Sequence, residues 1–164
     1  SMGSSLSDNF DLNGVRLDNQ DHFAVFQDLL FILEEKNGER ILRGINLIER
    51  GLVSTVKLSS MGEYNVTSMS VMERERLLVV VMHSFGTIEA RSYSIHSESL
   101  ELRKVLPLGV TPYPGLIATY TDLDNLYITF PKNLTNHVVN KLSFSATDIQ
   151  QQGRLHIYSH RCPA

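Results

Sequence analysis

The sequence predicts an all-β protein built from repeated units of antiparallel strands, and three observations support this fold class. Short runs of aliphatic and β-branched residues are bounded by turn residues, which is typical of strands. These runs recur about 48 residues apart, which is the length of one β-propeller blade. At 164 residues, 42% of them hydrophobic, the chain is long enough for a folded core. We therefore expect about three propeller-like blades, an incomplete ring.

The clearest strand candidates are residues 29–33 and 77–81, with residues 126–130 as a third. Each of the first two is followed by two more candidates. These follow-on segments are 39–47 and 52–58 in the first unit and 88–95 and 100–106 in the second. Asn37-Gly38, between the first pair, suits the positive φ of a tight hairpin turn. The order strand, turn, strand therefore repeats along the chain.

Superposing the units places Leu29 on Leu77 and Leu52 on Leu100. A third copy begins at residues 115–118, runs through the strand at 126–130, and continues in a strand at 153–158. A four-stranded sheet cannot bury both faces alone, so such units stack on one another. We expect an expression scar and lead-in over residues 1–9 and blades over residues 10–164.

Two stretches of the sequence do not follow the repeated strand pattern. The polar stretch with Asn133, Asn136 and Asn140 and three consecutive glutamines predicts an inserted surface loop over residues 132–152. Residues 23–35 have apolar spacing near that of a helix, which competes with the strand interpretation there.

Charge and cysteine usage restrict the class of partner and the compartment. The formal net charge of -3 gives no overall basic field, so we expect no nucleic acid partner. The single Cys162 cannot form an intramolecular disulfide, which favours a cytoplasmic protein. No apolar run reaches the roughly 20 residues that span a bilayer, so any membrane contact would be peripheral.

No catalytic, cofactor or metal site is predicted. Phosphate-binding and dinucleotide-binding glycine patterns and a nucleophile elbow are absent from the sequence. His156, His160 and Cys162 could be imagined as zinc ligands, but polar residues at a strand end explain them better. Asp122 and Asp124 could be paired acids, but their position between two strands favours a turn.

The predicted partner-binding residues are Arg74 and Arg76, which stand just before the aliphatic run at 77–81. Alternating charge at a strand start is most often a solvated turn. In a propeller, however, such residues ring one face, where arginine can bind a partner's carboxylates in a bidentate manner.

Residues 76–131 resemble the PROPPIN family, WD-repeat-like propellers that bind phosphoinositides. The similarity lies in a basic strand start, the aliphatic run, a strand with Tyr93, then Pro114-Gly115-Leu116 and a strand that ends in Phe130-Pro131. Residues 153–158 are similar to the family's next strand, after an insertion.

The resemblance implies a non-enzymatic scaffold that binds protein partners in autophagy-related, phosphoinositide-dependent membrane recruitment. The family's lipid site uses a Phe-Arg-Arg-Gly motif, which this sequence lacks, so no lipid-binding residue is assigned. Three blades also fall short of the family's ring of about seven. The chain is then a fragment, a truncated paralogue, or a subunit that closes with other copies or a different partner, and we expect an oligomer or larger assembly. The alternative is a compact β-rich domain of another fold that acts as a subunit or ligand-binding module.

Overall fold

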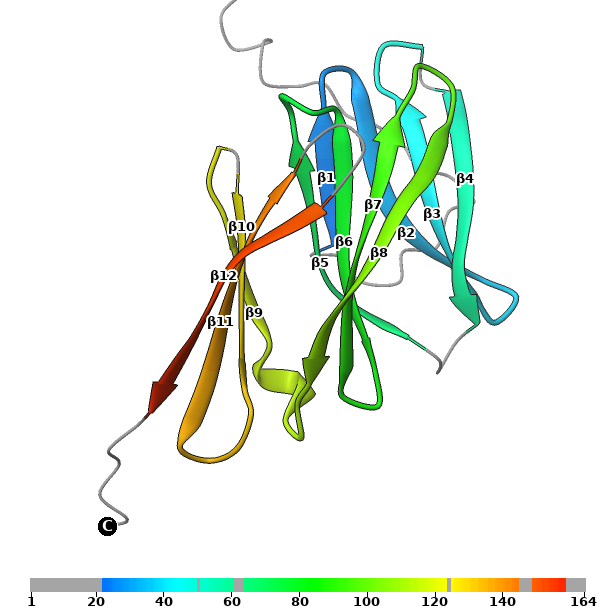
Figure 1. Cartoon of the computed structure of the whole chain (residues 1–164). Coiled ribbons are helices and arrows are strands. Elements are labelled where there is room, and N and C mark those ends of the chain that lie inside the picture. The colour runs from blue at the N-terminus through cyan, green and yellow to red at the C-terminus, as the bar shows by residue number, and fades with distance from the viewer. Residues whose placement is uncertain (1–21, 50, 61–63, 124, 145–148, 159–164) are drawn as a thin grey trace, which may run out of the picture.

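The computed structural model describes residues 22–158 except 50, 61–63, 124 and 145–148. The predicted scar and lead-in over residues 1–9 lie outside the described residues. The chain forms three four-stranded antiparallel sheets with one short 3-10 turn, so the predicted all-β class is confirmed. Figure 1 shows the sheets side by side, with the second between the first and the third.

The first sheet contains four strands in chain order: β1 (Phe23–Phe26), β2 (Leu29–Lys36), β3 (Glu39–Asn46) and β4 (Gly51–Ser60). Asn37 and Gly38 join β2 to β3 with φ values of 52° and 74°. Because both values are positive, this is the tight hairpin turn that the Asn-Gly pair predicts. Residues 23–35, for which a helix was the competing interpretation, form two strands instead.

The second sheet repeats the same order with β5 (Asn65–Met72), β6 (Leu77–Ser84), β7 (Thr87–Ile95) and β8 (Leu100–Val110). Its hairpin turn at Phe85-Gly86 also has two positive φ values, 49° and 86°. β6 is buried along six consecutive residues because a sheet packs against each of its faces.

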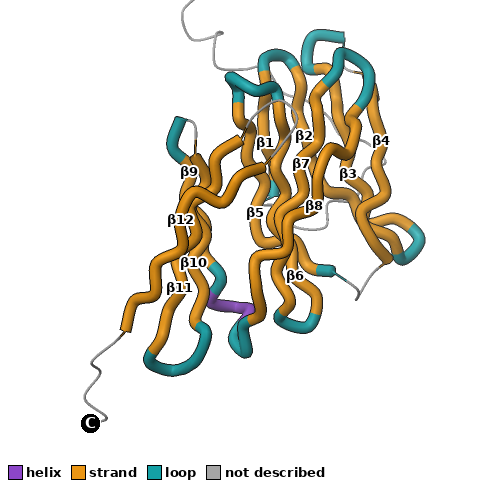
Figure 2. The backbone as a smooth tube through the Cα atoms, viewed as in Figure 1, coloured by secondary structure: helices purple, strands orange, loops and turns teal. Residues whose placement is uncertain are grey.

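The third sheet follows a 3-10 turn at Pro114–Leu116 and contains β9 (Ala118–Thr121), β10 (Asn125–Pro131), β11 (Asn136–Phe144) and β12 (Ile149–Tyr158). Figure 2 shows this turn as the one helical segment drawn among the strands. Among the described residues, no helix is long and apolar enough to cross a bilayer.

The predicted repeat is confirmed by the strand positions. The second strands of the three sheets begin at residues 29, 77 and 125, a constant spacing of 48 residues. The third strands begin at 39, 87 and 136, and the fourth at 51, 100 and 149. The three sheets have the same antiparallel strand order and stack in chain order. This arrangement is that of propeller-like blades rather than of a compact domain of another fold.

Alternate side chains of β6 enter two different cores. Val79 and Val81 pack in a cluster with Ile128 of the third sheet. Val80 packs in a cluster with Phe31 of the first sheet. We call the side of each sheet that points toward the following sheet its forward face, and the opposite side its rear face. Each joint therefore packs the forward face of one sheet on the rear face of the next.

The forward faces carry Phe31 and Leu33 in the first sheet and Val79 and Val81 in the second. Burial of each such side chain contributes roughly 1.5–3 kcal/mol to folding. The first strands, β1, β5 and β9, also lie next to one another across the joints. They form the inner edge of the stack, as the innermost strands of propeller blades do.

The predicted loop over residues 132–152 is wrong. It contains a short turn, all of β11 and the first residues of β12. Buried and exposed positions alternate along β11, and Asn136 and Asn140 take two of the buried positions. The Gln151 Nε2 donates to the Oδ1 of the buried Asn140 at 2.6 Å, so the neighbouring strand supplies a partner for this polar side chain at a core position. Polar residues at core positions made a strand resemble a loop.

Candidate partner-binding site

Arg74 and Arg76 lie in the turn between β5 and β6, and both are exposed. The Arg76 N–H donates to the Glu73 carbonyl oxygen at 3.2 Å, which closes the turn. The Arg76 carbonyl oxygen accepts from the Ile95 N–H at 2.9 Å, which ties the turn to the end of β7. The backbone that carries Arg76 is therefore fixed, with a φ of 55°.

The Arg76 guanidinium stacks on an aromatic ring of the neighbouring sheet. Its Cζ atom lies 5.1 Å from the ring centroid of Phe26, the last residue of β1, and Phe26 is buried. A cation–π contact of this kind holds the guanidinium near the ring without using its N–H donors. Guanidinium N–H groups bind carboxylates, so Arg76 is positioned where it can recognise an acidic group.

A groove lies next to this turn along the inner edge of the blades. Its volume is about 600 Å³, and its lining comes from all three inner strands and their turns. The lining residues are Phe23, Ala24, Val25, Met69, Ser70, Val71, Glu73, Thr121, Asp122 and Leu123. The Ser70 and Thr121 hydroxyl oxygens are 3.0 Å apart and join the second and third sheets in the groove. The groove therefore combines an apolar wall with a few polar groups.

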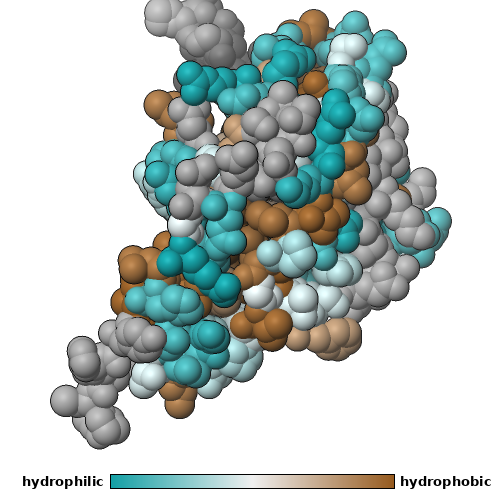
Figure 3. All heavy atoms as spheres, viewed as in Figure 1, coloured by the Kyte–Doolittle hydropathy of each residue, from teal (hydrophilic) through white to brown (hydrophobic). Residues whose placement is uncertain are grey.

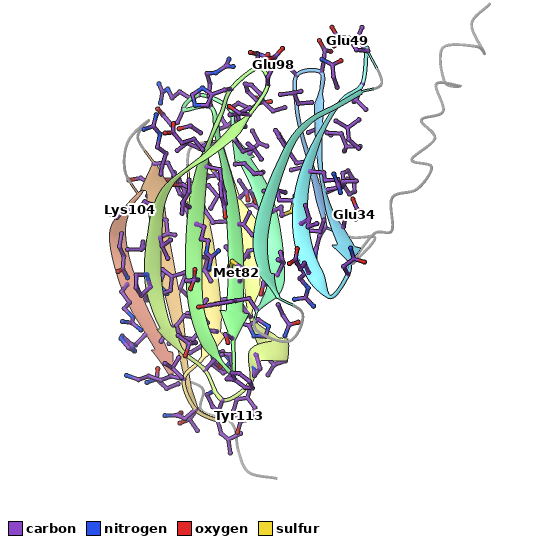
Figure 4. The ribbon with its side chains drawn as sticks, turned by 90° about the vertical axis from the view of Figure 1, so that its right-hand side faces the viewer. Glu34, Glu49, Met82, Glu98, Lys104 and Tyr113 are labelled. Carbon is purple, nitrogen blue, oxygen red and sulfur yellow. The ribbon has the colours of Figure 1, made fainter. Side chains whose placement is uncertain are left out.

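Several carboxylates lie at the same end of the blades as the two arginines. Figure 4 places Glu49 and Glu98 together at one end, with Tyr113 at the other. The turns that carry Glu49 and Glu98 lie at the same end as Arg76, because Ile95 pairs with Arg76 and Leu47 with Asp28. Glu73 and Glu75 flank Arg74 in the turn itself. The end of the blades that carries Arg74 and Arg76 therefore has both acidic and basic side chains and is not a basic surface.

Of the other candidates from the sequence, the structure describes Asp122 and His156. The Asp122 Oδ1 accepts from the Asn125 N–H at 3.0 Å, so Asp122 closes the turn before β10 as expected. His156 is exposed on β12, while Asp124, His160 and Cys162 lie outside the described residues. The described part of the chain contains no group of three potential metal ligands.

A partly buried polar cluster between the first and second sheets was not predicted. The Arg40 Nη1 donates to the Asn65 Oδ1 at 3.0 Å and to the Tyr64 carbonyl oxygen. The Arg91 Nε donates to Glu89 at 2.5 Å, and its Cζ lies 5.2 Å from the Tyr64 ring centroid. The charge pattern Glu89-x-Arg91 on one strand face was the available signal. These contacts join two sheets, which is a structural role.

Ionisation in this cluster follows from burial and from the neighbouring charges. Burial raises the pKa of Tyr93. A hydrogen bond to Glu89, together with its charge, raises the pKa of Tyr64. Burial, with a contribution from the Arg40 charge, lowers the pKa of His83. Each shift keeps the affected side chain neutral, as suits a joint between sheets.

Comparison with known proteins supports the fold. No family model matches the chain, and no curated protein matches it in sequence. A crystal structure of a protein from Lactobacillus plantarum is similar to it, with a TM-score of 0.62 and 18% sequence identity. The match covers 87% of this chain and 44% of that chain, so this chain spans less than half of that protein. The chain thus has an all-β fold of propeller-like blades.

Proposed function

We propose that the chain is a non-enzymatic scaffold whose propeller-like blades bind a protein partner at the end that carries Arg74 and Arg76. The observation that supports this most is the Arg76 guanidinium, stacked on Phe26 at 5.1 Å beside a groove of about 600 Å³. An arginine held in position next to an apolar recess is the arrangement that anchors many protein interfaces.

The surroundings restrict the chemistry of the partner. Arg76 suits one carboxylate of the partner, and the groove wall of Val25, Met69 and Leu123 suits an apolar side chain next to it. Glu73 and Glu75 would repel an acidic segment and attract a basic one. The expected partner segment therefore carries one acidic residue and one large apolar residue between basic residues.

Membrane recruitment belongs to this proposal only through the partner. The PROPPIN resemblance implies a cytoplasmic scaffold in autophagy-related, phosphoinositide-dependent recruitment, and the chain lacks the family's Phe-Arg-Arg-Gly motif. The carboxylates around Arg76 oppose direct binding of that end to an anionic membrane surface. We therefore assign lipid contact to the partner, with this chain at most peripheral to the membrane.

A selection from a random peptide display library, with the whole chain as bait, tests the proposal. Enriched peptides should share the acidic, apolar and basic pattern, and Arg76→Glu should weaken their binding at least tenfold. Its melting temperature should change little, because an exposed cation–π contact contributes only about 0.5–1 kcal/mol. Lys132→Glu is the matched control, since Lys132 is an equally exposed cation in the turn between β10 and β11, at the other end. Equal binding to the Arg76→Glu and Lys132→Glu variants would contradict the proposal.

A further inference from the structure

Phe85 is an exposed aromatic residue at a backbone position that does not favour it. It lies in the β6–β7 hairpin turn with a φ of 49°, and its side chain is 93% exposed. Bulky residues rarely adopt a positive φ, whereas asparagine and glycine adopt it readily. The equivalent turn of the first sheet has Asn37 at this position, with a φ of 52°. Neither the turn nor packing against the described residues requires phenylalanine here, and a residue held against its backbone preference points to function.

Exposed apolar residues of two other turns lie at the same end of the blades as Phe85. One is the connection from β8 to β9, and the other is the turn between β10 and β11. Figure 1 shows all three turns at one end, and Figure 3 shows hydrophobic residues on that end. Figure 4 places Tyr113 there, opposite Glu49 and Glu98. We call this surface the apolar end, and its exposed apolar side chains are Phe85, Val110, Tyr113, Leu116 and Leu134.

The buried Thr111 joins the three turns of the apolar end. Its N–H donates to the Gly86 carbonyl oxygen at 2.8 Å, and its hydroxyl donates to the Pro131 carbonyl oxygen. The Tyr113 N–H donates to the same hydroxyl oxygen at 3.1 Å. The backbone positions of the exposed side chains are therefore fixed in the free chain, so that binding of a partner costs little ordering of these turns.

The charge of the apolar end differs from that of the end that carries Arg76. Lys132 is the only charged residue among residues 84–87, 110–117 and 131–136, which make up the three turns. Lys132 is exposed, and it lies in the same turn as the exposed Leu134. An acidic partner segment would thus be attracted to Lys132 and would meet no carboxylate of these turns.

We infer that the apolar end is a second interaction surface, which binds a protein segment that combines large apolar residues with acidic residues. The apolar side chains of this segment pack around Phe85, as partners pack around the aromatic anchors of other interfaces. An acidic residue of the segment pairs with Lys132. The Arg76 end suits a segment with basic residues instead, so the two ends of the blades select different segments. This inference does not depend on the partner site at Arg76.

Subtractive selection from a random peptide display library tests the inference on the whole chain. Peptides that bind the Phe85→Asn variant are removed first, which discards those that bind the Arg76 end, and the rest are selected on the wild-type chain. The enriched peptides should combine apolar with acidic residues. The melting temperature of Phe85→Asn should equal or exceed that of the wild type, because asparagine suits this φ, as it does at Asn37.

Fluorescence anisotropy of an enriched peptide then locates its contacts. Leu134→Asn, in a different turn from Phe85, should weaken binding about tenfold if the peptide spans the apolar end. Lys132→Gln should weaken it about two- to fivefold, as expected for loss of an exposed ion pair. Ile48→Asn is the matched control, because Ile48 is an exposed apolar residue in the turn between β3 and β4, at the end that carries Arg76. This variant should bind the peptide as the wild type does.

Several results would overturn the inference. They are a selection that enriches no peptide or only basic peptides, equal binding to the wild type and the Leu134→Asn and Lys132→Gln variants, or a Phe85→Asn variant that melts well below the wild type. Binding of the wild type, but not of Phe85→Asn, to phosphatidylcholine–phosphatidylserine vesicles without peptide enrichment would assign the apolar end to a membrane surface instead. A wild-type dimer that Phe85→Asn dissociates, measured by light scattering, would assign it to a second copy.

Discussion

The Gly86 carbonyl oxygen accepts a hydrogen bond from the Thr111 N–H at 2.8 Å, which joins the β6–β7 hairpin to the connection between the second and third sheets. The Thr111 hydroxyl in turn donates to the Pro131 carbonyl oxygen at the end of β10. One buried threonine thus links the end of one blade to the next. This contact requires glycine at position 86, because a Cβ atom there would lie 2.2 Å from the Thr111 oxygen.

Gly86→Ala should therefore lower the free energy of unfolding by more than a glycine-to-alanine substitution at a positive φ where the added Cβ atom meets no neighbour. Gly38 provides the matched control: it has a similar φ of 74°, but nothing lies within 4 Å of an added Cβ atom. Gly38→Ala should cost about 1–2 kcal/mol from backbone conformation alone. Urea denaturation of both variants checks this, and equal losses would show that the Gly86–Thr111 approach is not as close as described.

The Asn140–Gln151 pair predicts a second result. Gln151→Ala should lower the free energy of unfolding by about 1–3 kcal/mol, because it leaves the buried Asn140 oxygen without its donor. Asn140→Leu combined with Gln151→Ala should recover most of this loss, since the leucine needs no hydrogen bond. Chemical denaturation measures both variants. A double variant less stable than Gln151→Ala would contradict this account of β11 and β12.

His83 predicts the direction of the pH dependence. Burial, and then the Arg40 charge, lower its pKa in the folded chain, so the unfolded chain binds the proton first as the pH falls. The contribution of neutral His83 to folding stability is complete above its unfolded-state pKa of about 6.5. This contribution is lost as the pH falls toward the lower pKa that His83 has in the folded state. The melting temperature should fall between about pH 7 and about pH 5, and less steeply in His83→Gln. An identical slope in this variant would exclude His83 as a contributor.

The repeat was predictable because its signals are local. Aliphatic runs at the second strand and the positive-φ turn at Asn37-Gly38 depend only on neighbouring residues, and they lie where the sequence predicts them. The first strands were missed because β1 is four residues long and β5 has a mostly half-buried pattern. β11 was missed because two asparagines stand at core positions, where they depend on a partner strand.

The candidate site was predictable only as a pair of charges. Position in the sequence indicated that Arg74 and Arg76 stand at a strand start, and the structure places them in that turn. It could not show that Arg76 stacks on Phe26, because the two residues are 50 positions apart and meet only when the sheets pack. The carboxylates of Glu49 and Glu98 reach the same end through turns of other hairpins. Contacts across joints therefore define the site.

Alternate side chains of β6 face two different sheets, and methyl nuclear Overhauser effects test this arrangement most directly. Val79 and Val81 should show contacts with the Ile128 methyl groups, while Val80 should show contacts with Leu33 and none with Ile128. This result would place one sheet on each side of β6, as stacked blades require. Contacts of Val79 with Leu33, or of Val80 with Ile128, would contradict the arrangement of the three sheets.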